Sequence, residues 1–132
     1  MSAEAVHGYA QDVSFRATQA MATLYTAVKM DVSTDDNYVD IATANSDRGI
    51  GFTQTTQSTV GGPITIRVAG FSLARCSGGW TRGDRLTPTT AGALVTTSTA
   101  GHLICAIAMN TVSSGENGEV QIVSPAIRYD SF

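Results

Sequence analysis

The chain has 132 residues, which fits one domain with a real core, and 42% of them are hydrophobic, which argues against wholesale disorder. Its formal net charge is −3 and its basic residues do not cluster, so we expect no direct contact with nucleic acid. Charged residues make up 14%, against roughly 25% in typical soluble domains. Thr, Ser, Gly and Ala take their place, which suits β-strands and a surface that lies against another protein.

Residues 1–23 differ in composition from the rest, because Ala, Gln, Ser and Thr surround isolated large apolar residues. We predict an extended N-terminal arm in which Tyr9 and Phe15 anchor on a neighbouring subunit, with a frayed terminus as the alternative. Deletion of residues 1–15 is then expected to leave the fold intact. The chain start shows no signal-peptide pattern and no apolar run approaches the ~20 residues of a membrane span, so we expect a cytoplasmic product without a membrane partner.

Residues 24–125 have the pattern of a β-domain. Alternating residues and turn signals predict short strands in this order: Leu24–Met30, Tyr38–Ala42, Ile50–Gln54, Ile64–Val68, Phe71–Arg75, Arg85–Thr87, Leu94–Thr97, Leu103–Met109 and Val120–Val123. Turn signals roughly every 8–12 residues indicate an all-β sandwich or barrel, and the lack of a long helical period disfavours βαβ units. We therefore predict a compact antiparallel β-barrel or β-sandwich.

Three local signals refine this prediction. Gly70 is expected to break the chain between two strands, and Asn117-Gly118 is the strongest hairpin-turn signal in the sequence. Pro125 is expected to limit further pairing, so that residues 126–132 form a C-terminal tail carrying Tyr129 and Phe132.

A hairpin pattern appears twice in the chain. Residues 50–54 and 64–68 are alternating strands around a Thr/Gly-rich link, and residues 104–109 and 119–123 repeat this arrangement around a Ser/Gly/Asn link. The similarity is loose, but it points to a β-fold assembled from hairpins.

The acidic residues do not predict catalysis. Asp31, Asp35, Asp36 and Asp40 lie in a tract rich in Ser, Thr and Asn, where Asp typically orders a turn by bonding nearby backbone amides. The tract lacks the spacing and the Gly of an EF-hand loop.

The sulfur and imidazole groups also give no pattern. His7, His102, Cys76 and Cys105 include no pair close in sequence, as a zinc site would normally need. We interpret the two cysteines as buried free thiols, and Cys105 lies in an apolar strand where a thiol is normally inert. We therefore predict no catalytic, cofactor-binding or metal-binding residues, no cofactor and no enzyme activity.

The chain has one Trp, Trp80, which is either a core residue or an interface anchor. Together with the aromatic residues near the two ends, it completes the set of candidate interface residues, which is Tyr9, Phe15, Trp80, Tyr129 and Phe132.

A series of small-residue motifs runs from about Leu24 to Val123. The series includes, in order, the tract Leu24–Lys29, Ile50-Gly51-Phe52-Thr53-Gln54, the strand Ile64–Gly70, Gly83-Asp84-Arg85-Leu86, Ala91-Gly92-Ala93-Leu94 and Ile107-Ala108. By the order and spacing of these motifs, the chain resembles the small capsid cement (head decoration) proteins of tailed bacteriophages. The arm of residues 1–23 departs from the shortest members of that family.

The resemblance implies a β-tulip, barrel or jelly-roll-like sandwich that docks on the outer surface of the phage capsid. Its partner would be the major capsid protein, whose subunits it would hold together at local three-fold or two-fold positions. A homo-oligomer is expected, with a trimer favoured and a dimer possible.

Two other functions remain as alternatives. One is a carbohydrate- or ligand-binding β-module of a phage tail or fibre, which would need an exposed aromatic platform of Trp80 with Tyr25 or Tyr38. The other is a small hydrolase using the Asp cluster or a Cys–His pair.

Overall fold

The computed structural model describes residues 10–32 and 36–128. These residues form strands and one short 3₁₀-helix, which are, in chain order, β1 (Ala10–Ala17), β2 (Ala27–Met30), β3 (Tyr38–Ile41), β4 (Gly49–Thr53), β5 (Pro63–Arg75), β6 (Arg85–Pro88), η1 (Thr90–Gly92), β7 (Leu94–Thr96), β8 (Leu103–Ala108) and β9 (Asn117–Arg128). The prediction of an all-β fold is confirmed.

The strands form one sheet in the order β1-β3-β2-β4-β5-β9-β8-β6-β7, which folds into two adjoining rings. In the first, which we call the N-ring, β1 pairs with both β3 and β5, so that β1, β3, β2, β4 and residues 63–69 of β5 close on themselves. In the second, the C-ring, residues 71–75 of β5 continue into β9, β8, β6 and β7. A single bridge between Cys76 and Leu94 returns β7 to the end of β5.

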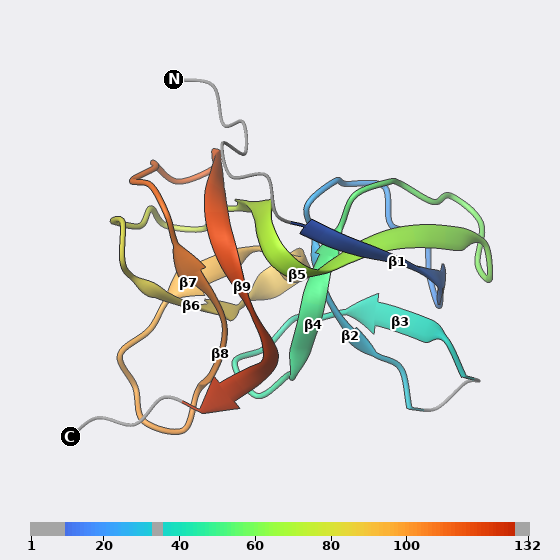
Figure 1. Cartoon of the computed structure of the whole chain (residues 1–132), viewed down its shortest axis with the longest axis horizontal. Coiled ribbons are helices and arrows are strands. Elements are labelled where there is room, and N and C mark those ends of the chain that lie inside the picture. Colours follow the sequence, from blue (N-terminus) through green and yellow to red (C-terminus); the bar gives the residue numbers. More distant parts are fainter. Residues whose placement is uncertain (1–9, 33–35, 129–132) are drawn as a thin grey trace.

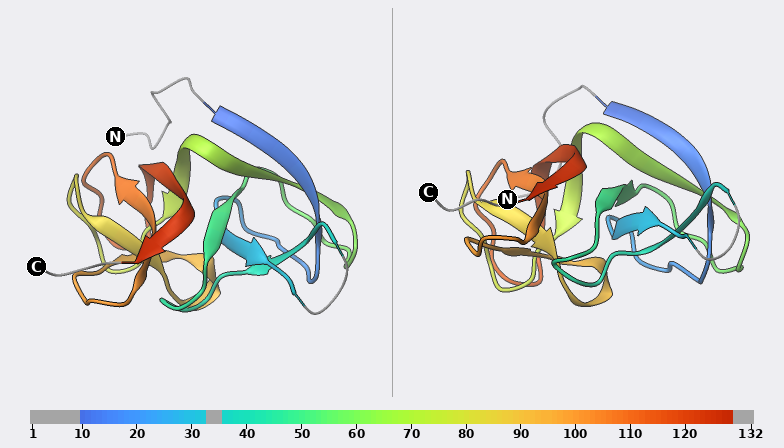
Figure 2. Two further views of the ribbon diagram at one scale, coloured as in Figure 1. Left: turned by 60° about the horizontal axis from the view of Figure 1, so that its bottom comes forward. Right: turned by 90° about the horizontal axis from the view of Figure 1, so that it is seen from below.

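β5 is the strand that the two rings share, and Figures 1 and 2 show it arching from β1 to β9. Its even-numbered residues are buried at both ends, with Ile64 and Ile66 in the N-ring and Ala74 in the C-ring. The expected break at Gly70 is wrong: the residue has a φ of 90°, which lets the strand bend, and it still pairs with Ala10.

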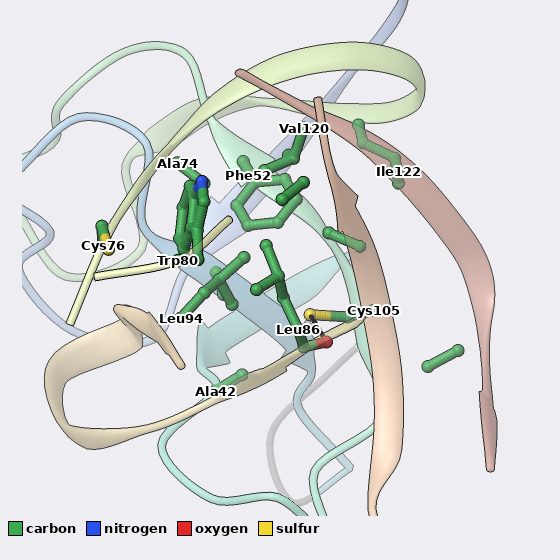
Figure 3. Close-up of a cluster of buried hydrophobic side chains, with 14 of the residues drawn as sticks. Ala42, Phe52, Ala74, Cys76, Trp80, Leu86, Leu94, Cys105, Val120 and Ile122 are labelled. Atoms are coloured by element: carbon green, nitrogen blue, oxygen red, sulfur yellow. Dashed lines mark hydrogen bonds between the residues drawn. The ribbon is translucent and has the colours of Figure 1, made fainter. Parts of the chain in front are cut away.

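Each ring has its own apolar core. The N-ring encloses Ala17, Met21, Val28, Val39, Ile64 and Ile66. The larger core of the C-ring surrounds Trp80, and Figure 3 shows Phe52, Leu86 and Leu94 pointing toward the same centre. Because Phe52 comes from β4 of the N-ring, its side chain joins the two halves of the molecule.

The segment predicted as an arm is in part a strand. β1 pairs with β5 from Ala10 opposite Gly70 to Arg16 opposite Pro63, and Ala17 is fully buried. Because residues 10–15 are part of this paired strand, we now expect deletion of residues 1–15 to disturb the N-ring. The sequence shows no clear apolar alternation for this strand because its side chains are mostly exposed. Backbone pairing rather than apolar burial holds it in place.

The C-terminal strand is longer than predicted. β9 continues past Pro125, with Ile127 opposite Ile104 and Arg128 opposite Leu103, so residues 126–128 belong to the sheet and not to a tail. Both residues of the expected hairpin turn at 117–118 also lie in β9.

Gly118 serves side-chain packing rather than a turn. A Cβ at this position would lie 2.6 Å from Cζ2 of Trp80, so the missing side chain makes room for the indole ring. The positive φ that the link requires is supplied by Gly115, whose φ is 87°.

Both predicted hairpins are confirmed, since β4 pairs with β5 and β8 with β9, each in antiparallel register. The predicted antiparallel pairing does not hold throughout the sheet. β1 pairs with β3 in parallel, with Arg16 opposite Tyr38 and Ala17 opposite Val39, and the bridge between Cys76 and Leu94 is also parallel. The first predicted strand is also shorter, because Tyr25 has a φ of 62° and β2 begins at Ala27.

Candidate functional site

The residues predicted to form an interface do not gather on one surface of the described structure. Phe15 of β1 is half-buried and packs against the N-ring core, and Trp80 is 4% exposed in the C-ring core. Trp80 is thus a core residue, which was one of its two interpretations, and it offers no surface to a partner. Tyr9, Tyr129 and Phe132 lie outside the described residues.

The aromatic platform expected for a carbohydrate-binding module is therefore not formed around Trp80. Tyr38 is half-buried, and the guanidinium carbon of Arg16 lies 5.0 Å from its ring centroid, a cation–π distance. Tyr25 is half-buried as well.

One described aspartate of the acidic tract, Asp40, orders the backbone beside it. Asp40 Oδ1 accepts hydrogen bonds from the backbone N–H of Ile41 (2.8 Å) and from Nε2 of Gln19 (2.5 Å). Asp36 is exposed in a turn, and Asp35 lies outside the described residues. Across residues 10–32 and 36–128, no three His, Cys, Asp or Glu side chains come close enough to hold a metal ion.

Both cysteines are buried free thiols, as predicted. Burial raises the pKa of Cys105 to about 12, and its Sγ contacts the carbonyl oxygen of Leu86 at 3.7 Å (Figure 3). Burial is also the main cause of the raised pKa of Cys76. A hydrogen bond with the backbone of Gly79 lowers this pKa, and the charge of Glu116 raises it. Neither thiol is suited to act as a nucleophile at neutral pH.

A polar groove of ≈ 760 Å³ lies on the C-ring. We call it the threonine groove because hydroxyl side chains dominate its walls. Its lining comes from three segments: Thr43, Ala44 and Asn45; Gly83, Asp84, Arg85, Thr87, Pro88 and Thr89; and Val95, Thr96, Thr97, Ser98, Thr99 and His102.

Strand alternation explains why this face is polar. Leu86 of β6 and Leu94 of β7 point into the C-ring core, so Thr87 and Val95, which pair across the two strands, lie on the opposite face and line the groove. Arg85 precedes them on the same face.

Short hydrogen bonds hold the side chains at the rim. Asp84 Oδ2 accepts from the backbone N–H of Thr81 at 2.8 Å, which closes the turn before β6. The hydroxyl of Thr97 lies 2.6 Å from Nδ1 of His102 and accepts from the backbone N–H of Thr99 at 3.2 Å. His102 is half-buried and contributes to the lining of the groove.

Sequence reasoning missed this groove. The signal was present in the alternation of Thr with Leu and Pro from Arg85 to Thr89 and in the polar run Thr96–Thr99. It gave no motif, because the groove forms only where the hairpin of β6 and β7 meets the loop at residues 43–45, which is distant in sequence.

No protein-family model and no curated protein matches this chain. Its structure is similar to the crystal structure of the head fiber gp8.5 N base of bacteriophage phi29, with a TM-score of 0.60 and 15% sequence identity. The match covers 90% of this chain and 98% of that chain. It establishes a shared all-β fold across nearly the full length of both chains.

No helix within the described residues is long and apolar enough to cross a membrane.

Proposed function

We propose that this protein is a structural component of a tailed-phage head, and that it attaches to the outer surface of the capsid as a cement or decoration protein. The observation that carries the proposal is the fold match to the N base of a phage head fiber, which extends over 98% of that chain. The motif order from Leu24 to Val123, which resembles cement proteins, supports the same assignment independently of the fold.

The partner we propose is the major capsid protein, with the chain bridging neighbouring subunits. Low charge favours such contacts, because charged residues are depleted at the centres of protein interfaces. If one chain contacts two capsid subunits, its second contact is effectively intramolecular, so each single contact can be weak. Self-association, with a trimer favoured over a dimer, would multiply the number of contacts further.

We also propose that the protein does not act as an enzyme. In the acidic tract, Asp40 bonds to the backbone N–H of Ile41 and Asp36 lies exposed, and the pKa values of both thiols are raised by burial. These features disfavour the hydrolase alternative without testing it.

The direct experiment is to mix the purified protein with undecorated heads, sediment the heads and count the bound copies per head. We expect saturable binding at a fixed number of copies. Failure to reach saturation, or binding that persists equally on unrelated particles, would contradict the proposal.

A truncation sharpens this test. Removing residues 1–9 keeps every described strand, whereas removing residues 1–15 also removes most of β1. We expect the shorter truncation to fold and to bind heads less tightly, because Tyr9 is a proposed anchor. Unchanged head binding would remove the N-terminal segment from the proposed contact.

A further inference from the structure

Asn117-Gly118, the dipeptide expected to form a hairpin turn, has a chemical reactivity that its place in β9 controls. Asn followed by Gly is especially prone to deamidation, because Gly has no side chain to hinder the attack of its own amide nitrogen on the Asn side chain. In a flexible turn such a pair is free to react. In the folded protein both residues belong to β9, where Asn117 lies opposite Arg75 and Gly118 opposite Ala74 of β5.

The attacking nitrogen is held within the sheet. The N–H and C=O of one strand residue point to the same side, and those of the next residue point to the other side. The carbonyl oxygen of Glu119 accepts from the N–H of Met109, next to β8, at 2.8 Å. The N–H of Gly118 therefore faces β5 and its pairing partner Ala74, and not the side chain of Asn117.

Packing around Trp80 also fixes this peptide. Gly118 is buried, and a Cβ on it would lie 2.6 Å from Cζ2 of Trp80 and 3.0 Å from Cγ2 of Val112. To bring its nitrogen to Cγ of Asn117, the peptide would have to tilt out of the strand pairing and away from the indole ring. The reaction therefore requires β9 to separate from β5 first.

We propose that Asn117 is a latent deamidation site that reacts when the pairing between β5 and β9 opens. In the open state the amide nitrogen of Gly118 loses its proton and bonds to Cγ of Asn117, and the side-chain nitrogen of Asn117 leaves as ammonia. Water then opens the resulting succinimide at either of its carbonyls, which gives aspartate or isoaspartate at position 117. Because ammonia is lost, the change is permanent.

Isoaspartate would keep the C-ring from closing again in its original register. It adds one methylene group to the backbone, so the residues of β9 on its two sides can no longer both match their partners on β5. Residues 71–75 of β5 join the C-ring through this pairing alone among the described strands. The reaction thus converts a transient opening of the C-ring into a lasting one.

The test is to age the full chain at mildly alkaline pH, in buffer and in unfolding urea, and to follow each Asn by peptide mass spectrometry. We expect Asn117 to react at least about a hundredfold more slowly in buffer than in urea, because opening limits the reaction. Asn45, which lies in an exposed turn before Ser46, is the internal reference, and its rate should differ less. Equal rates for Asn117 in the two conditions would overturn the proposal.

Two variants show whether opening of the C-ring controls the rate. Trp80→Phe removes part of the packing against Gly118, so the Asn117 rate should rise several-fold in buffer and stay unchanged in urea. Asp12→Ala, on the outside of the N-ring, is the control and should raise the rate less. A rate in Trp80→Phe no higher than in wild type would overturn the proposal.

The aged protein tests the consequence for the C-ring. Chains carrying isoaspartate should exchange the amide hydrogens of β8 and β9 faster than fresh chains do, with a smaller change in the N-ring. Unchanged protection of β9 would overturn this part of the proposal. All these readouts use the isolated chain, so a failure of fresh protein to bind heads would count against the proposed function alone.

Discussion

The N-ring and the C-ring share β5 but are held closed by different means. In the N-ring, β1 pairs with both β3 and β5, so backbone hydrogen bonds complete the circle around a small core, which contains six buried residues among those described. In the C-ring, a single bridge between Cys76 and Leu94 connects β7 to the end of β5 within residues 10–32 and 36–128. The core of this ring is larger, with fifteen buried residues in the same part of the chain.

The comparison teaches that one sheet can be closed either by backbone pairing or by side-chain packing. Where pairing is continuous, as along β1, exposed polar residues suffice on the strand. Where the closure is a single bridge, the large buried side chains of Trp80, Phe52 and Leu86 must hold the strands together. Substitutions in the two rings should therefore fail in different ways.

The largest effect is expected in the C-ring core. Trp80→Ala should lower the free energy of unfolding by about 3–5 kcal/mol, because it leaves a cavity where the ring is closed mainly by packing. Urea unfolding followed by circular dichroism measures this. Trp80→Phe should cost clearly less, since it refills part of the space, and a loss below about 1 kcal/mol for the Ala variant would show that packing does not close the C-ring.

The matching change in the N-ring is Ile66→Ala on β5. It should cost about 2–5 kcal/mol, and we expect a smaller loss than for Trp80→Ala because the paired strands of the N-ring stay connected around the smaller cavity. The same unfolding assay applies. A larger loss than that of Trp80→Ala would reverse the proposed order of the two rings.

Close approach of two backbones makes Gly51 a test of N-ring closure. A Cβ on this residue of β4 would lie 2.1 Å from the carbonyl oxygen of Arg67 on β5. Gly51→Ala must therefore push the paired strands apart, at a cost of about 1–3 kcal/mol. The control is Ala69→Gly on β5, which measures how much added backbone flexibility alone lowers the free energy of unfolding. Gly101→Ala does not serve as a control because Gly101 has a positive φ of 95°. Hydrogen exchange of the β4 and β5 amides should accelerate in Gly51→Ala, and unchanged protection would contradict the account.

A salt bridge in the N-ring gives a pH-dependent test. Burial opposes ionisation of Asp47, but the N–H groups of Thr43 and Ala44 and the ammonium of Lys29 at 3.1 Å outweigh it, so the pKa of Asp47 lies below its usual value. A carboxyl with a lowered folded pKa stabilises the protein above its unfolded pKa of about 4, and this contribution is lost as the pH falls through the folded pKa.

Asp47→Asn should therefore flatten the loss of stability below about pH 4, and at neutral pH the variant should lose up to about 1 kcal/mol. Thermal unfolding at a series of pH values measures both effects. Parallel pH profiles for the variant and wild type would show that Asp47 does not contribute to acid unfolding.

The smallest effect is expected on the outside of the N-ring. Nε of Arg67 donates to Oδ1 of Asp12 at 2.8 Å, joining β1 to β5, but both side chains are partly exposed. Asp12→Ala should cost less than about 1 kcal/mol because solvent screens such a pair. The loss should shrink in high salt. A salt-independent loss of several kcal/mol would mean that side-chain charge, not backbone pairing, holds β1.

Local patterns in the sequence predicted the strands whose apolar residues alternate, and both hairpins, because burial of one face leaves a clear period of two. They could not predict β1, whose residues are mostly exposed, or the continuation of β9 beyond Pro125. Asn117-Gly118 was interpreted as a turn because Gly permits positive φ, whereas Gly118 is needed beside Trp80. Such roles depend on contacts between distant segments, which no local pattern records.

The same reason limited prediction of the site. The groove lining comes from three segments that only the fold brings together, and the aromatic residues expected to form a surface include Trp80, which is buried.

The most direct test of the account is an electron cryomicroscopy reconstruction of heads saturated with the protein. We predict density on the outer surface that fits the N-ring and C-ring together, seated across neighbouring major capsid protein subunits. Saturated heads without added outer density, or with the chain inside the shell, would contradict the central claim.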